Sequence, residues 1–276
     1  MTLITSISGI RGTIGGTVGD SLSPVDIVRF TTAYANFIKS TRNNIVSNNE
    51  YKNTIVIGRD ARISGLMVRN IVSGVLMSCG LNVKDLGLST TPTVEMAVIL
   101  EKAAGGIIIT ASHNPKQWNA LKLLNNKGEF LSNEDGNKIL SFAKKEKYLY
   151  SKVDFLGNYI KIDNYNDIHI NKILNLSLVD VDLIKSAKFK VVLDAVNSTG
   201  GIIIPQLLNK LGVQCIKLYC EPNGKFPHNP EPLPENLVEI SNIVVKKKAD
   251  LGIVVDPDVD RLAFICEDGS MFGEEY

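Results

Sequence analysis

The sequence alternates short apolar runs with helical patterns, and this alternation restricts the chain to a fold built on a mostly parallel sheet. Strand-like apolar runs occur at residues 54–57, 81–86 and 106–109. Apolar positions at helical spacing fill the gaps, at residues 64–79 and 94–102. Gly80 can adopt the left-handed conformation that often ends a helix. Strands and helices in this order form βαβ units, so we expect helices to cover a parallel sheet.

The second half of the sequence repeats this plan. Strand-like runs occur at residues 190–193, 213–218 and 251–255, and helices are expected at about 201–212 and 234–248. The separation of Asp60 and Gly80 is close to that of Asp194 and Gly212, which suggests a duplicated unit, although two α/β domains could share this spacing by loop economy alone. We therefore predict an α/β fold with two tandem three-layer αβα domains of similar topology, each with a mostly parallel, mixed sheet.

The segment between the two repeats predicts a hairpin and a boundary. Residues 121–131 are typical of a hairpin that turns at Asn125–Gly128. The polar stretch at residues 150–166 favours a domain boundary. We place the domains at residues 1–158 and 159–276.

Composition narrows the classes of partner. The 276 residues carry 30 basic and 29 acidic side chains, a balance that offers nucleic acid or an anionic membrane no basic surplus. No apolar run approaches the roughly 18 residues of a transmembrane helix, and the N-terminus lacks the pattern of a leader. The cysteines form no C-x-x-C pair and are expected to be reduced core residues: Cys79, Cys215, Cys220 and Cys266. We therefore predict a cytoplasmic protein whose partners are neither nucleic acid nor membrane; the sequence does not indicate its oligomeric state.

Residues 105–115 place one hydroxyl at the end of a buried strand. Three isoleucines behind two glycines show no alternation, which is typical of a strand covered on both faces. Ligands of such sheets bind beyond the carboxyl ends of the strands, where Ser112 lies. A helix or turn beginning at Pro115 would surround Ser112 with free N–H groups suited to an anion. The alternative is a strand-to-helix turn in which Ser112 or Asn114 serves only as a cap.

The acidic loop, residues 256–261, follows the last strand of the second repeat. Asp256, Asp258 and Asp260 alternate, so in an extended chain their side chains point to one side, and a cation would relieve their repulsion. Oxygen ligands without nearby Cys or His pairs favour Mg²⁺ or Ca²⁺. An EF-hand needs glycine where Arg261 stands, and the other alternative is a solvated turn. Arg261 is suited to phosphate, although it could instead neutralise the aspartates.

Three segments together resemble the α-D-phosphohexomutases, which include phosphoglucomutases, phosphomannomutases and phosphoglucosamine mutases. They are Ser-Gly-Ile-Arg-Gly at 8–12, Thr-Ala-Ser-His-Asn-Pro at 110–115 and Asp-Pro-Asp-Val-Asp-Arg at 256–261. The resemblance implies a phosphoryl group moved between O1 and O6 of a hexose phosphate, with phosphorylated Ser112 as carrier and a hexose 1,6-bisphosphate as priming intermediate. It implies Mg²⁺ held by Asp256, Asp258 and Asp260 together with the phosphorylated serine.

The resemblance also implies roles for the surrounding residues. Lys122 matches the lysine of proton transfer, and as a general base it would need a pKa lowered by neighbouring cations. Arg11, Arg261 and Asn114 would bind phosphate or substrate, and His113 would support the serine. Other readings of single residues stay open: Lys122 as a solvated hairpin lysine, His113 as a packing or capping residue, Arg11 as a partner of local carbonyls.

Members of the family resemble a four-domain chain, and this sequence corresponds to the first two domains. The loops that recognise the sugar and its distal phosphate belong to the other two, so we expect the isolated chain to show little or no mutase turnover. Overall likeness favours glucosamine phosphate, with glucose and mannose phosphates as alternatives. Two further classes stay open: a metal-dependent phosphatase or phosphotransferase, and a non-catalytic sugar-phosphate-binding fragment.

Overall fold

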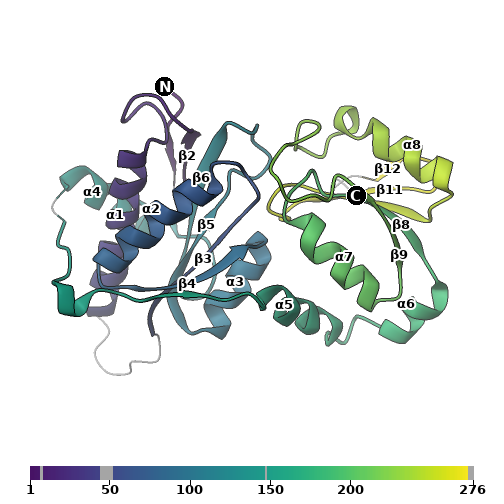
Figure 1. Ribbon diagram of the computed structural model, residues 1–276. Helices are drawn as coiled ribbons and strands as arrows, with labels where there is room; N and C mark the ends of the chain where they lie inside the picture. The colour runs from purple at the N-terminus through teal and green to yellow at the C-terminus, as the bar shows by residue number, and fades with distance from the viewer. Residues whose placement is uncertain (7–8, 44–51, 147, 273–276) are drawn as a thin grey trace.

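The computed structural model describes residues 1–6, 9–43, 52–146 and 148–272, which form two lobes side by side (Figure 1). Each lobe is built around its own sheet, and helix α5 (Tyr165–Leu174) lies where the chain passes from one lobe to the other. Ile7, Ser8 and Gly273–Tyr276, which belong to segments discussed above, lie outside the described residues. No helix of the described part is long and apolar enough to cross a membrane.

The first domain has a seven-stranded sheet in the order β1-β2-β6-β5-β3-β4-β7. Its strands are β1 (Ile4–Ser6), β2 (Gly9–Thr13), β3 (Lys52–Arg59), β4 (Asn82–Leu88), β5 (Ala103–Ile109), β6 (Trp118–Leu124) and β7 (Tyr159–Lys161). Its helices are α1 (Pro24–Asn43), α2 (Gly65–Ser78), α3 (Thr91–Leu100), α4 (Asn133–Lys145) and the short η1 (Val153–Phe155). Alternate residues of β5 feed two cores: Ile107 and Ile109 pack with α1, α2 and α4, whereas Ile108 packs with α3. The isoleucine run is thus buried on both faces, as predicted.

The second domain has a five-stranded sheet in the order β12-β11-β10-β8-β9. Its strands are β8 (Lys190–Asp194), β9 (Gln214–Leu218), β10 (Leu251–Val255), β11 (Leu262–Ile265) and β12 (Met271–Phe272). Its helices are α6 (Val181–Ala187), α7 (Gly200–Lys210), η2 (Pro234–Asn236) and α8 (Val238–Lys247). Helix α8 covers one face of the sheet, and α6 and α7 contribute to the core on the other. The prediction of two three-layer α/β domains is confirmed.

The two sheets share one topology. The order β6-β5-β3-β4 in the first corresponds to β11-β10-β8-β9 in the second, and in each only the first of these pairings is antiparallel. The likeness reaches single residues: Asp60 Oδ1 accepts the N–H of Arg62 at 2.9 Å, and Asp194 Oδ1 accepts the N–H of Val196 at 2.9 Å. The strand ends that correspond in the two domains therefore carry different side chains.

Three local features differ from the prediction. Strand β7 follows the boundary placed between residues 158 and 159, yet it pairs with β4 and extends the first sheet. Helix α3 begins at Thr91 instead of near Val94, because Thr90 Oγ1 accepts the N–H of Thr93 at 3.2 Å and caps the helix. The expected hairpin at 121–131 has its turn but only a single bridge, from Leu124 to Phe130, since β6 pairs with β5 and β2 instead. The four cysteines are free, but only Cys79 is buried in the core as expected, and the other three are half-buried.

Candidate active site between the two domains

Ser112 lies in the serine loop, residues 110–117, which joins β5 to β6. No helix begins at Pro115. The loop leads directly into β6, which pairs antiparallel with β5. Ser112 has a left-handed backbone with φ +48°, a conformation that costs a non-glycine residue roughly 1–3 kcal/mol. Its N–H donates to Thr110 Oγ1 at 2.9 Å. A strained serine is thus held by its own loop, and its hydroxyl faces the second domain.

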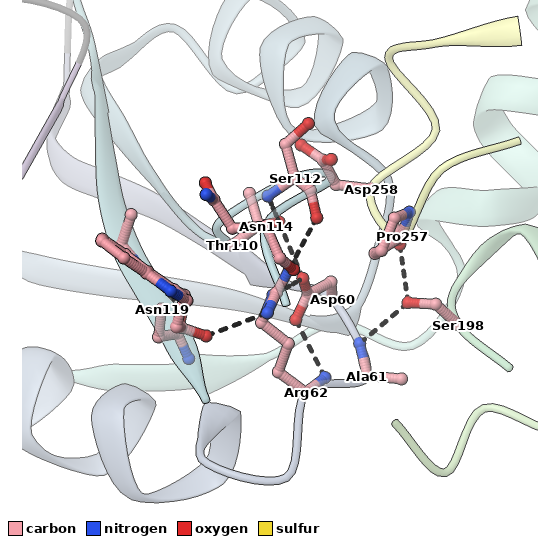
Figure 2. Close-up of polar contacts among 12 residues, drawn as sticks. Asp60, Ala61, Arg62, Thr110, Ser112, Asn114, Asn119, Ser198, Pro257 and Asp258 are labelled. Atoms are coloured by element: carbon pink, nitrogen blue, oxygen red, sulfur yellow. Dashed lines mark hydrogen bonds and ion pairs between the residues drawn. The ribbon is translucent and has the colours of Figure 1, made fainter. Parts of the chain in front are cut away.

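The buried guanidinium of Arg62 fastens this loop from below (Figure 2). Arg62 Nε donates to Asp60 Oδ2 at 2.9 Å. The other four donors reach backbone carbonyls, at 2.5 to 3.0 Å, of Ser112, Asn114, Pro115 and Trp118. All five N–H groups of the guanidinium are therefore used. Sequence reasoning missed this residue, although Asp60-Ala61-Arg62 follows a strand end just as the serine loop and the acidic loop do.

The acidic loop connects β10 to β11, and its backbone turns around one carboxylate. Asp256 Oδ1 accepts the N–H groups of Asp260 and Arg261 at 3.1 and 3.2 Å. Strand β11 then pairs antiparallel with β10, which excludes an EF-hand, whose loop would continue into a helix. One carboxylate oxygen from each of Asp256, Asp258 and Asp260 lies within 4.8 Å of the others. The loop thus gathers the three carboxylates in an arrangement that could hold a metal ion.

The serine loop and the acidic loop meet across the domain interface. Ser112 Oγ donates to Asp256 Oδ2 at 2.7 Å and lies 3.4 Å from Asp260 Oδ1. Thr91, at the start of α3, donates through its N–H to the carbonyl of Asp258 at 2.8 Å and through its hydroxyl to Asp258 Oδ2 at 2.6 Å. Thr91 was also missed, since its role depends on a contact between domains. The hydroxyl of the first domain and the carboxylates of the second form one site.

The electrostatics of this site fit a divalent cation. Burial, reinforced by Asp258 and Asp260, raises the pKa of Asp256 well above its ordinary value. Asp258 is fully buried, and its Oδ1 has no hydrogen-bond partner among the described residues. A buried carboxylate oxygen without a partner is costly, and a cation would satisfy it. Three hard oxygen ligands suit Mg²⁺.

Lys122, on β6, is placed differently from what a general base requires. Its ammonium donates to Asp258 Oδ2 at 2.7 Å and to Asp260 Oδ2 at 2.8 Å. Burial would lower the pKa of Lys122, but the two carboxylates outweigh burial and raise the pKa above its ordinary value. The expectation that cations would lower this pKa is therefore wrong for the site as described, because the neighbours of Lys122 are anions. The same ion pairs keep the pKa of Asp258 below its ordinary value despite burial.

A cavity of about 250 Å³ opens above the serine. Seven of the nine site residues expected from the sequence line it: Arg11, Ser112, His113, Asn114, Lys122, Asp260 and Arg261. The other two, Asp256 and Asp258, are buried beneath it. The structure therefore brings all nine residues together.

Two acidic residues that the sequence did not single out complete the surroundings. Glu231 Oε1 lies 3.5 Å from Arg261 and 3.9 Å from His113 Nε2. Burial and the charge of Arg261 lower the pKa of His113, which favours the neutral imidazole, and its Nδ1 lies 3.4 Å from Ser112 Oγ. Burial raises the pKa of Glu95 to about 6, and Asp260 and Asp258 act in the same direction. Neither glutamate lies in a motif, so only the fold reveals them.

Comparison with known proteins decides the family. Residues 3–149 match "Phosphoglucomutase/phosphomannomutase, alpha/beta/alpha domain I", and residues 167–269 match the corresponding domain II. The chain belongs to the α-D-phosphohexomutase family. The family expected from the three segments is confirmed, with the first two domains in the family's order.

Relatives agree with this assignment, and a solved structure shares the fold. A phosphoglucomutase/phosphomannomutase of Thermococcus kodakarensis is 34% identical over 94% of this chain and 55% of its own length. A Methanopyrus kandleri protein named "Probable phosphoglucosamine mutase" is 32% identical over 96% of this chain and 54% of its own. The crystal structure of a phosphoglucomutase/phosphomannomutase family protein from Burkholderia thailandensis matches 97% of this chain and 56% of its own, with TM-score 0.77 and 23% identity. The chain thus spans about half the length of the curated relatives that it matches.

Proposed function

We propose that this chain carries the phosphoryl-transfer centre of a phosphohexomutase. Ser112 takes a phosphoryl group from a hexose 1,6-bisphosphate and returns it to a hexose monophosphate, with Mg²⁺ held by the three aspartates. The observation that carries the proposal is the 2.7 Å hydrogen bond from Ser112 Oγ to Asp256 Oδ2, which joins a strained serine of one domain to the acidic loop of the other. Names of the relatives support hexose phosphates as the substrate class.

The side chains supply the parts of an in-line phosphoryl transfer. Ser112 Oγ forms a bond to phosphorus while the bond from phosphorus to the sugar oxygen breaks. The serine proton passes to solvent in the cavity above Ser112, since Asp256 would be occupied by Mg²⁺. The sugar oxygen takes a proton from Lys122 Nζ, which lies beside the carboxylates of Asp258 and Asp260. In the reverse direction the protons return to the same atoms.

The remaining groups neutralise charge and orient the phosphate. Arg11 and Arg261 line the cavity that opens above Ser112, and their guanidinium groups can bind phosphate oxygens in pairs. When bound, Mg²⁺ would neutralise charge on the transferred phosphoryl group. Asn114 and neutral His113 line the same cavity beside the serine.

Among the hexoses, glucosamine phosphate is the proposed substrate, supported by the Methanopyrus relative and by others with the same printed name. Names that combine glucose and mannose activities occur among equally similar relatives, so a direct comparison must decide. The two domains hold the centre for phosphoryl transfer, and we expect the isolated chain to complete this half-reaction but little full turnover.

Intact-protein mass spectrometry tests the proposal. The purified chain is incubated with Mg²⁺ and, in separate samples, the 1,6-bisphosphates of glucosamine, glucose and mannose. We expect one added phosphoryl group on Ser112, fastest with glucosamine, and none in Ser112→Ala or after chelation with EDTA. Equal labelling of Ser112→Ala, or none in the wild type with any of the three sugars, would refute it.

A further inference from the structure

The segment Asp60–Arg62, directly after β3, contacts both the serine loop and the second domain. Within the first domain, Arg62 holds the serine loop. Toward the second domain, the N–H of Ala61 donates to Ser198 Oγ at 3.2 Å (Figure 2). One short segment thus lies between the serine that would carry the phosphoryl group and the domain that holds the carboxylates.

Ser198 continues this connection into the acidic loop. Its hydroxyl, fully buried, donates to the carbonyl of Pro257 at 2.6 Å (Figure 2). Thr199 Oγ1 donates to the same carbonyl at 2.8 Å. Pro257 stands between Asp256 and Asp258, so its position fixes the direction in which both carboxylates leave the backbone.

The second domain makes another contact, with the side chain of Arg62. The ring of Phe226 lies 5.1 Å from the guanidinium carbon, within the range of a cation–π contact. Gly224, with φ +70°, leaves room for this approach, because any side chain there would collide with the carbonyl of Ala61. The second domain therefore contacts residues 60–62 through a hydrogen bond, through close backbone packing and through an aromatic ring.

We infer that Ser198 and Phe226 are positioning residues that set the distance between Ser112 and the carboxylates of the acidic loop. They act through Ala61 and Arg62 and do not touch the reacting atoms. The path runs from Ser112 through Arg62 and Ala61 to Ser198, and from there to Pro257 between two of the metal ligands. This inference rests on the proposed function, since the aligned groups are those of phosphoryl transfer.

Single-turnover phosphorylation tests the inference. The chain is mixed with saturating glucose 1,6-bisphosphate and Mg²⁺, quenched at intervals, and the phosphorylated fraction is measured by intact mass. Ser198→Ala leaves the N–H of Ala61 without its acceptor and removes one of two donors to Pro257. Because a misplacement of about 1 Å can cost about 100-fold, we expect the rate constant to fall by about 10- to 100-fold. The final phosphorylated fraction should stay within a factor of two.

Ser186→Ala is the matched control, since it removes an exposed hydroxyl of the second domain that donates only to a nearby carbonyl, and it should keep the wild-type rate constant. Phe226→Leu, at a half-buried loop position, should lower the rate constant about two- to fivefold. It decides the question if Ser198→Ala does not fold. Wild-type rate constants in both variants, or a reduced final fraction at an unchanged rate constant, would overturn the inference. If the wild type itself takes up no phosphate, the proposed function fails first and the positioning role falls with it.

Discussion

Arg62→Met should destabilise the first domain more than any surface charge deletion. The substitution keeps a long apolar side chain but removes the cation from buried Asp60 and the donors from four carbonyls. Breaking a buried ion pair costs about 3–5 kcal/mol. Each carbonyl left without a donor adds about 1–3 kcal/mol, part of which is recovered as the loop relaxes and water enters. We expect a loss of at least about 4 kcal/mol in the free energy of unfolding.

The single tryptophan, Trp118, offers a local assay, because it opens β6 and its own carbonyl accepts from Arg62. Urea unfolding followed by Trp118 fluorescence reports on the first domain alone. Arg62→Lys keeps a cation for Asp60 but lacks the planar fork of donors, so it should lose about 2 kcal/mol. Lys161→Met, which breaks an exposed pair with Asp163 at 2.6 Å on the same sheet, serves as the control. If Arg62→Met unfolds at the same urea concentration as that control, the guanidinium does not fasten the serine loop.

Three further predictions concern charge and metal. Glu95 has a pKa of about 6, above its unfolded value of about 4.3, so its ionised form disfavours the folded state at high pH. In EDTA, Glu95→Gln should therefore stabilise the protein by about 1 kcal/mol at pH about 8, after allowance for the partial exposure of Glu95. At pH about 4 the substitution should not change the stability. Burial alone would lower the pKa of His228, but the hydrogen bond of His228 to Asp194 at 3.0 Å raises this pKa. The contribution of His228 to stability is therefore complete below about pH 6.5 and disappears as the pH rises through the raised pKa. In parallel urea titrations, the difference in unfolding free energy between wild type and His228→Gln should shrink over that pH interval. Mg²⁺ at a hundred times its dissociation constant should stabilise the wild type by about 2.7 kcal/mol in thermal unfolding, and Asp258→Asn should abolish most of this gain. Equal gains in both proteins would show that the metal does not bind at the acidic loop.

The repeated topology could be predicted because it depends on local patterns. An unalternated isoleucine run before Ser112 identifies a strand buried on both faces, and its end marks the site. The pairing of β7 with β4 could not be predicted, since three exposed residues carry no pattern and are placed by the chain around them. The same holds for the pairing of β6 with β2, which lies near the start of the chain and far from β6 in sequence.

The candidate site divides in the same way. Ser112 and the three aspartates lie in sequence segments whose residue types predict their chemistry, and the fold brings these residues together. The role of Arg62 depends on where four carbonyls of a turning loop point, which follows from the tertiary fold and not from the residue type. The pKa of Lys122 was misjudged for a related reason: its neighbours in space are Asp258 and Asp260, which lie far away in the sequence.

Return of the phosphoryl group from Ser112 to a sugar tests the central claim most directly. The phosphorylated chain, freed of bisphosphate, is mixed with Mg²⁺ and glucosamine 6-phosphate, and the products are separated by mass. The account predicts that Ser112 loses its phosphoryl group as glucosamine 1,6-bisphosphate appears in equal amount. Release of inorganic phosphate at the same rate with and without the sugar would contradict it and identify a phosphatase instead.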